Sequence, residues 1–494
     1  MKSKFLFYIL VCTVLAFLSC AEKERSNHRS QSPNFLFCIA DDWSFPHAGI
    51  YGDAVIRTPN FDRIAREGIL FTKAYTAAPS CSPSRASILT GQDIYRLEAG
   101  GCLFGTLPKK FPVYTQILEK TGYAVASTGK GYDPADLSLE DWEHNPAGLP
   151  IQEREMEVPN YIRSTDYAAN FADFLNARDT NQPFCFWYGA SEPHRPYHYG
   201  IGASHHYNLA DIKVPEFLPD TDTIRNDVAD YYYEVEWFDR HLGRMIKVLE
   251  QRGELENTVI LVTSDNGMPF PRAKANLYDY GTRMPLAIRW GNKVQPGQIC
   301  ELPVSLIDIA PSILEMAQVG IPEAMTGISL VPLLANSGSS LGRDFVVTAL
   351  ERHTLARPDQ KGYPMRGIHT KDFTYIHNFA PERWPQGDPD IDAWPQGFYG
   401  DIDDGASKSQ FENDPDRWPD LFSASFGKRP AEELFEEAND PFQMQNLADD
   451  PAYEEIKKRL KEKLFDYLDE TEDPRHIGLS PWDHYHFSGG ADWY

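Results

Sequence analysis

The sequence has few cysteines and few cations for its size. Seven cysteines are scattered over 494 residues, and their spacing fits neither a zinc site nor a small disulfide framework. Against 72 Asp and Glu there are only 47 Lys and Arg, so the formal net charge is −25. This balance argues against nucleic acid or an anionic membrane surface as the main partner. No internal repeat of about 20–50 residues is present, which argues against a solenoid or a propeller.

Long apolar runs are also absent, except near the start of the chain. Residues 1–20 combine a positive start with a short apolar run, which predicts a signal peptide. Ser19 before Cys20 resembles a bacterial lipoprotein cleavage site; a plain signal peptide that is cut nearby is the alternative. Residues 21–32 form a polar tether. We therefore expect an exported protein of the periplasm or outer cell surface, with membrane contact only through a lipid anchor at Cys20.

Short apolar runs alternate with segments of helical spacing between residues 33 and 345. Strands are expected at residues 34–40, 123–127, 184–189, 258–263 and 285–290, and helices at 61–68, 228–252 and 306–318. This alternation predicts an α/β domain with a largely parallel sheet. Sheets of that kind bind ligands outside the carboxyl ends of their strands.

The character of the sequence changes after residue 345. Short strands are expected at 345–350 and 373–377, and an amphipathic helix at 453–468. We predict a smaller α+β domain over residues 346–494, with an irregular Trp-, Pro- and Asp-rich insertion at 380–430. One continuous domain with a decorated edge is the alternative.

Polar clusters follow two of the expected strands. Asp41 and Asp42 follow the first, and Asp265 and Asn266 follow the strand that ends near residue 263. Either pair alone is more typical of a helix cap or a turn. Together they offer four oxygen ligands of the kind that Ca²⁺ or Mg²⁺ prefers, and they predict a metal site.

The most specific motif lies at residues 81–85, which read Cys-Ser-Pro-Ser-Arg and lead to Leu-Thr-Gly at 89–91. It resembles the signature of the sulfatase family. Further segments resemble that family at residues 34–42, 58–71, 263–267, 281–285, 327–333 and 433–447. The resemblance implies an alkaline-phosphatase-like sandwich with a large mixed, mostly parallel sheet and a smaller C-terminal α+β domain. It also implies that a formylglycine-generating or sulfatase-maturing enzyme oxidises Cys81 to formylglycine.

The resemblance assigns roles to individual residues. One hydroxyl of hydrated formylglycine attacks sulfur, and the second then expels sulfate. Calcium would be held by the modified residue 81 with Asp41, Asp42, Asp265 and Asn266. Arg85 would orient the formylglycine. Lys130 and Lys274 would bind sulfate oxygens, and His194 would contact the sulfate and protonate the leaving group.

The sequence departs from the family pattern at Tyr132, where many sulfatases carry His after Gly-Lys-x. Either Tyr132 or another residue must take the place of that His. Sulfamidase-like members of the family show the strongest resemblance, yet they carry His at the positions of Tyr132 and Ser191. We therefore expect an O-sulfatase that acts on saccharides of a sulfated polysaccharide, with a sulfamidase of heparan-type saccharides as the alternative. A phosphatase or phosphodiesterase of the same superfamily and a non-catalytic glycan-binding protein are weaker alternatives.

Several residues are candidates for contact with the saccharide. His353 lies near the segment that reads the substrate in sulfamidases, and Arg366 could pair with a carboxylate or sulfate or form a structural ion pair. Aromatic residues of the insertion could stack on sugar faces or could pin their own loop: Trp384, Trp394, Tyr399 and Trp418.

Overall fold

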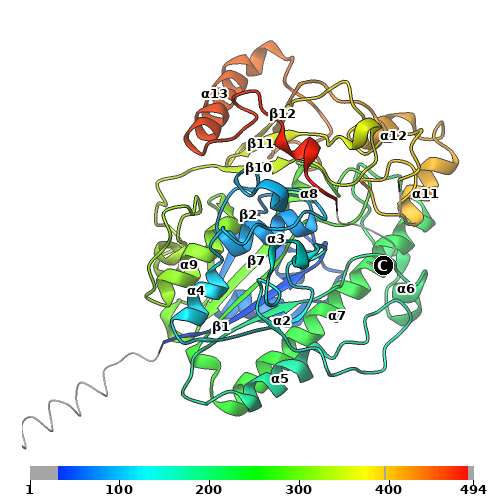
Figure 1. The fold of residues 1–494 in the computed structure, drawn as a ribbon. Coiled ribbons are helices and arrows are strands. Elements are labelled where there is room, and N and C mark those ends of the chain that lie inside the picture. Colours follow the sequence, from blue (N-terminus) through cyan, green and yellow to red (C-terminus); the bar gives the residue numbers. More distant parts are fainter. Residues whose placement is uncertain (1–31, 394–395, 488–494) are drawn as a thin grey trace, which may run out of the picture.

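The computed structural model describes residues 32–393 and 396–487 (Figure 1). The predicted signal peptide, Cys20 and most of the tether lie outside the described residues, as does Trp394. Among the described residues, no helix has the length and apolar character needed to cross a membrane.

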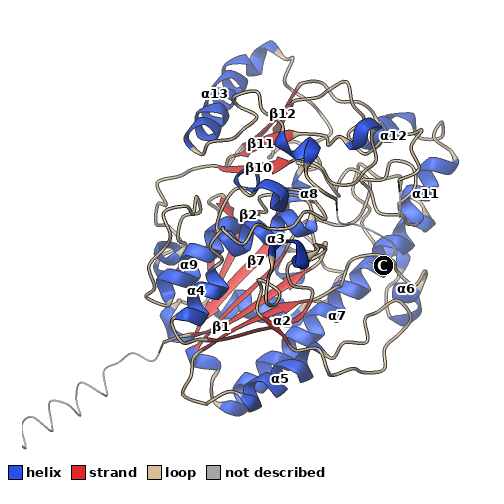
Figure 2. Ribbon diagram, in the orientation of Figure 1, coloured by secondary structure: helices blue, strands red, loops and turns tan. Residues whose placement is uncertain are grey.

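A large central sheet forms the base of the molecule (Figure 2). Within the described residues its nine strands are β1 (Asn34–Ala40), β2 (Ile69–Tyr75), β3 (Ala124–Gly129), β4 (Leu149–Pro150), β5 (Phe184–Gly189), β6 (Thr258–Ser264), β7 (Arg283–Trp290), β8 (Gln298–Cys300) and β9 (Val304–Ser305). Their order is β4-β3-β5-β1-β6-β7-β2-β8, and β9 also pairs with β2. Only β7 runs against its neighbours in this part of the chain. The predicted mixed, mostly parallel sheet is confirmed.

Helices cover both faces of the sheet because its strands are apolar on both sides. Leu36 and Cys38 of β1 pack with α2 (Pro59–Glu67), α5 (Tyr167–Ala177) and α7 (Asp222–Arg252). On the other face, Phe35 and Phe37 pack with α3 (Cys81–Thr90), α4 (Tyr114–Lys120), α9 (Ile309–Met316) and α10 (Val331–Ala335). Full burial of each such side chain contributes about 1.5–3 kcal/mol.

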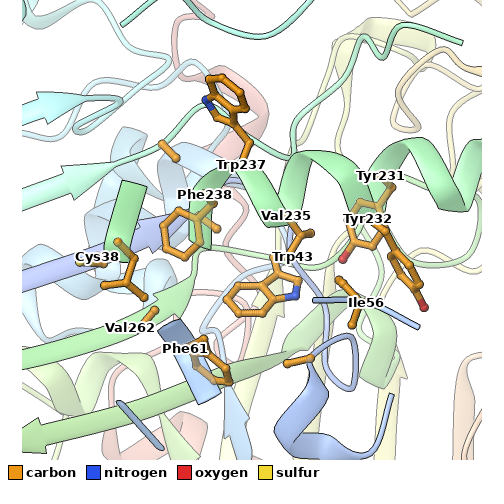
Figure 3. Packing of buried hydrophobic residues seen from close by; sticks show 14 of the residues in the cluster. Cys38, Trp43, Ile56, Phe61, Tyr231, Tyr232, Val235, Trp237, Phe238 and Val262 are labelled. Carbon is orange, nitrogen blue, oxygen red and sulfur yellow. The ribbon is translucent and has the colours of Figure 1, made fainter. Parts of the chain in front are cut away.

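Aromatic side chains pack closely between the end of β1, α2 and α7. Trp43, directly after β1, lies against Phe61 of α2 and Phe238 of α7, with ring centroids 5.0 and 5.8 Å apart (Figure 3). Its indole Nε1 donates to the carbonyl oxygen of His47 at 2.7 Å. These contacts fix the segment that follows β1.

Strand β2 and helix α3 are among the elements that were not expected from the sequence. The pattern of β2 is interrupted by Lys73, which is nevertheless buried because its ammonium pairs with Glu437. Helix α3 has no polar face, since all ten of its residues are buried, so it lacks the periodicity by which an amphipathic helix is recognised. The helix expected at 306–318 is a 3₁₀ turn followed by α9.

A second, antiparallel sheet lies above the first (Figure 1). Its strands are β10 (Val346–Leu350), β11 (Met365–His369), β12 (Phe373–Asn378) and β13 (Glu432–Glu436), and α13 (Glu454–Glu470) packs on it. The backbone N–H of Ala349 donates to the oxygen of Ala77 at 2.8 Å, which ties this sheet to the segment before α3. A second sheet beside the central one confirms the fold class; the division into two domains at residue 345 stays a prediction.

The insertion at 380–430 is not wholly irregular, and this prediction was wrong in part. It contains α11 (Ala406–Asn413) and α12 (Pro419–Phe426). Shorter helices elsewhere are α6 (Ile201–His205) and α8 (Asp279–Thr282). Tyr399 packs on Phe426 at a ring distance of 4.8 Å, and Trp418 packs on Phe411 at 6.4 Å. These two aromatic residues therefore pin the loop itself.

Candidate active site

The predicted site residues meet at the carboxyl edge of the central sheet. The neighbouring parallel strands β3, β5, β1 and β6 all end at this edge. The segments that follow them carry Lys130, His194, Asp41, Asp42, Asp265 and Asn266. Ligand sites form at this edge of parallel sheets because the loops that leave the strands converge there.

Cys81 is the first residue of α3 and is 3% exposed. Its Sγ lies 3.6 Å from Lys274 Nζ and 3.9 Å from Asp42 Oδ1. Burial raises the pKa of the thiol well above its usual value, and the charge of Asp41 adds to this. An unmodified thiol here stays protonated near neutral pH and is a weak nucleophile.

The three carboxylates of the predicted metal site lie together. Asp41, Asp42 and Asp265 each offer an oxygen, and these atoms lie within 4.8 Å of one another. Asp41 Oδ1, Asp42 Oδ2 and Asn266 Oδ1 are buried without a hydrogen-bond partner among the described residues. Unpartnered oxygens of buried carboxylates are costly unless a cation accompanies them. The donor set is all oxygen, so these residues fit a hard divalent cation.

Arg85 holds the two strand ends together. It is fully buried, and its Nε donates to Asp265 Oδ2 at 2.7 Å. Its Nη1 donates to the carbonyl oxygens of Lys130 and Gly131 at 2.8 and 3.1 Å. Nη2 lies 3.6 Å from Asp41 Oδ1. Because Arg85 lies one helical turn after Cys81, it also fixes the start of α3 against the acid cluster.

Two lysines face the same cluster from opposite directions. Lys130 Nζ lies 2.5 Å from Asp41 Oδ2, and Lys274 pairs with Asp42 Oδ1. Although burial opposes their charged forms, Asp41 raises the pKa of Lys130 and Asp42 raises that of Lys274. Both ammonium groups therefore keep their charge and can bind an anion beside Cys81.

Burial and positive charge compete at the carboxyl groups. Burial alone would raise the pKa of Asp41, but Lys130 and its other cationic neighbours lower it well below its usual value. At Asp42 burial prevails and raises the pKa. Burial likewise raises the pKa of Asp265 to about 6. Additional positive charge between these groups would favour their ionised forms.

His194 faces the cluster from the segment after β5. Its Nδ1 lies 2.6 Å from the carbonyl oxygen of Arg195, so Nδ1 carries a proton and donates it to that oxygen. Nε2 lies 3.9 Å from Asp42 Oδ2 and 4.0 Å from Asp403 Oδ1. A proton on Nε2 would therefore point toward these two carboxylates.

Comparisons with known proteins agree with this geometry. A model of the sulfatase family matches residues 33–319. The chain belongs to the sulfatase family. A second model, that of the C-terminal region of N-sulphoglucosamine sulphohydrolase, matches residues 272–394. The resemblance drawn from Cys81 to Arg85 and the classification as a sulfuric ester hydrolase are confirmed.

Relatives resemble this sulfatase over most of its length. Human N-sulphoglucosamine sulphohydrolase is 29% identical over 90% of this chain and 92% of its own. An ulvan-active sulfatase of Formosa agariphila is 28% identical over 90% of this chain and 82% of its own. A solved structure described as a complex with its substrate D-glucosamine-2-N,6-O-disulfate has a TM-score of 0.63 at 23% identity, and it covers 90% of this chain and 98% of that one. This last likeness supports the alkaline-phosphatase-like fold.

Of the two alternatives left open for the missing His in this sulfatase, the structure disfavours Tyr132. Its ring is fully buried in the apolar layer beneath α3. Its hydroxyl donates to the carbonyl oxygen of Gly105 at 2.6 Å. The side chain therefore packs in the core and does not face the pocket.

Arg366 is likewise not a substrate-binding residue. Its guanidinium is fully buried, and it donates to Asp473 at 2.7 and 3.0 Å and to Glu351 at 2.7 Å. The alternative of a structural ion pair is confirmed. The positive charge of Arg366 is already paired with these two carboxylates, so it is not available to a saccharide.

We expect Arg366→Met to destabilise the protein by about 3–5 kcal/mol, because it leaves the buried carboxylate of Asp473 without its cation and leaves Glu351 with Arg475 alone. Urea denaturation measures the loss. Arg417→Met is the matched control, since Arg417 is exposed and its removal should cost no more than about 0.5 kcal/mol. A variant of normal stability with a raised KM would restore the substrate-binding role of Arg366.

His353 lies at the pocket, and a residue that the sequence analysis missed lies beside it. His353 follows β10, and its Nδ1 lies 2.8 Å from Ser80 Oγ. Burial lowers its pKa to about 4, so its ring is neutral near pH 7. The missed residue is Asp403, which comes from the insertion and lies 3.6 Å from Lys274 Nζ. No motif marks Asp403, since it stands among other acidic residues of an irregular segment.

Proposed function

We propose that this protein is an exported sulfatase that removes O-sulfate groups from saccharides of a sulfated polysaccharide, with Cys81 converted to formylglycine and Ca²⁺ bound beside it. The observation that carries this proposal is the convergence of Cys81 with three cationic side chains, His194 and an all-oxygen acid cluster at one sheet edge. The protonated state of the unmodified thiol supports the need for modification. A formylglycine-generating or sulfatase-maturing enzyme is the partner that the proposal requires.

In this proposal, different residues of the chain bind the sulfate and transfer the proton. Lys130 and Lys274 bind oxygens of the sulfate group as it approaches residue 81, and they stabilise the negative charge that develops on them. His194 holds a proton at Nε2 and donates it to the departing oxygen of the saccharide. Arg85 keeps residue 81 against Asp265. Hydrated formylglycine supplies two hydroxyls, and Ca²⁺ held by Asp41, Asp42, Asp265 and Asn266 supplies Lewis-acid charge for the sulfate oxygens.

Two sequence features support an O-sulfate over an N-sulfate. Tyr132 and Ser191 replace the His residues of sulfamidase-like enzymes, and Tyr132 is buried away from the pocket. A sulfamidase remains the second candidate, because the match at residues 272–394 is to a sulfamidase model. The ulvan-active relative and the human sulfohydrolase represent the two alternatives.

A panel of substrates tests the proposal. Protein matured with a formylglycine-generating enzyme is incubated with O-sulfated glucosamines, sulfated ulvan oligosaccharides and glucosamine N-sulfate, and released sulfate is measured. Release from an O-sulfated saccharide alone supports the proposal. Release only from the N-sulfate favours the second candidate, and phosphate ester hydrolysis without sulfate release contradicts both.

Export is proposed from residues 1–20, with Cys20 as the lipid-modified residue. The protein would then act in the periplasm or at the outer cell surface. N-terminal peptide mapping of membrane-fraction protein tests this: a lipid-modified peptide that begins at Cys20 supports the anchor. A mature chain that keeps residues 1–20 would contradict export by this route.

A further inference from the structure

Asp403, from the insertion at 380–430, borders the active site, because one of its carboxylate oxygens lies within 4.8 Å of ligand atoms of Asp42 and His194. Arg195, directly after His194, pairs with both oxygens of Asp227 at 2.8 and 2.7 Å. The same carboxylate accepts hydrogen bonds from the N–H and the hydroxyl of Ser407 at the start of α11. The insertion is therefore fastened to the segment that carries His194, and its residues 401–404 are held at the pocket.

Asp401 and Asp403 of this insertion differ in their hydrogen-bond partners. Asp401 is saturated: it accepts from the N–H and hydroxyl of Thr354 and pairs with Arg357 at 2.5 Å. Asp403 accepts one hydrogen bond, from Gln396 Nε2 to Oδ1 at 3.1 Å. Its Oδ2 is buried without a hydrogen-bond partner among the described residues. Asp401 is thus structural, whereas Asp403 keeps a free acceptor.

The surroundings of Asp403 are those of the reacting centre. Its Oδ2 lies 3.6 Å from Lys274 Nζ, and its Oδ1 lies 4.0 Å from His194 Nε2. His353 is close enough to interact electrostatically with it. Lys274 lies in turn 3.6 Å from Cys81 Sγ. Asp403 is 6% exposed, so a buried carboxylate with one unpartnered oxygen lies beside the groups that we propose bind the sulfate and protonate the leaving group.

A carboxylate in this place repels the sulfate and attracts a hydrogen-bond donor. The sulfate is drawn to Lys130, Lys274 and the cation site. The part of the substrate that meets Asp403 must then carry an O–H or N–H group, because a charged acceptor that substrate buries without a donor costs binding energy.

We propose that Asp403 is a specificity-determining residue that accepts a hydrogen bond from a hydroxyl or amine of the saccharide next to the scissile sulfate. This inference rests on the proposed function and names the chemistry that its substrate must carry. Substrates that present an anionic group at that position would be rejected by the same charge.

The test compares Asp403→Asn with its matched control Asp404→Asn, which makes the same change at the exposed neighbouring residue. Kinetics are measured with glucosamine 6-O-sulfate and glucose 6-sulfate, and inorganic sulfate is used as an inhibitor that has no donor. We expect kcat/KM to fall about 30-fold or more for Asp403→Asn with a donor-bearing saccharide. The inhibition constant of sulfate should stay the same or decrease. Asp404→Asn should leave both quantities within about twofold.

The outcomes separate the alternatives. Loss with glucosamine sulfate only indicates the amine as the donor, and loss with both saccharides indicates a hydroxyl. Two results would overturn the proposal. The first is weaker inhibition by sulfate together with a loss of kcat/KM on p-nitrophenyl sulfate equal to that on the saccharides, which would show that Asp403 merely positions Lys274 or His194. The second is unchanged kinetics in Asp403→Asn. Asp403→Ala is the second variant should the first not fold. If the wild-type protein hydrolyses no sulfate ester, the proposed function itself is contradicted.

Discussion

Replacing Cys81 by Ala is expected to lower sulfate release by about 10⁴-fold or more, because it removes the nucleophile of the reaction. The remaining groups can still bind sulfate, so inhibitor affinity should change little. Peptide mapping of the wild-type protein supplies the chemical counterpart. The peptide that contains residue 81 should be lighter by the mass of H₂S and heavier by that of one oxygen atom, as expected for oxidation to the aldehyde.

Cys300→Ala is the matched control for this variant. Cys300 is buried in β8 and forms no disulfide. The Cys300→Ala variant should keep the kcat/KM of the wild type. In the wild-type protein, the peptide that contains Cys300 should retain its thiol. A protein that cleaves sulfate esters while residue 81 remains a thiol would contradict the formylglycine mechanism and reopen the phosphatase alternative.

Much of the site could be predicted because the sequence carries it in short segments. Asp41 and Asp42 directly follow a wholly buried strand, and Asp265 follows another. The carboxyl ends of parallel strands meet at one edge, so placement after a strand is enough to bring these residues together. The signature around Cys81 then identified the chemistry that this edge supports.

The errors arose where a side chain depends on distant partners. Arg366 pairs with Asp473, 107 positions away in the sequence, and nothing local shows that pairing. Tyr132 stands where the resemblance to the sulfatase family leads us to expect His, yet its hydroxyl donates to the carbonyl oxygen of Gly105 within the core. Sequence position alone could not indicate which way the side chain points.

Asp403 was missed for the converse reason. It stands between Asp401 and Asp404 in an acidic segment without periodicity, so the sequence does not distinguish the three. Their roles separate only once Arg357 is seen to pair with Asp401 and solvent to reach Asp404. The edge of the central sheet therefore carries the residues of the proposed reaction. The insertion, which is distant in sequence, carries the residue that we propose selects the substrate.

Removing divalent cations with a chelator should abolish activity and lower the melting temperature, and Ca²⁺ should restore both. The reason is the buried acid cluster, where Asp41 and Asp42 each keep an oxygen without a hydrogen-bond partner among the described residues. Calcium at 100 times its dissociation constant would stabilise the folded protein by about 2.7 kcal/mol. Differential scanning fluorimetry across a calcium titration measures this.

Asp265→Asn should remove most of the calcium response and lower kcat at least about 10²-fold, because one charged ligand is lost from the metal site. Asp239→Asn is the control: Asp239 is also buried, but its oxygens accept from Asn60 and from the N–H of Phe61. That variant should lose stability and keep its calcium response. If both variants respond to calcium like the wild type, the cation binds elsewhere. The buried oxygens at the end of β1 would then rely on Arg85, Lys130 and Lys274 for positive charge.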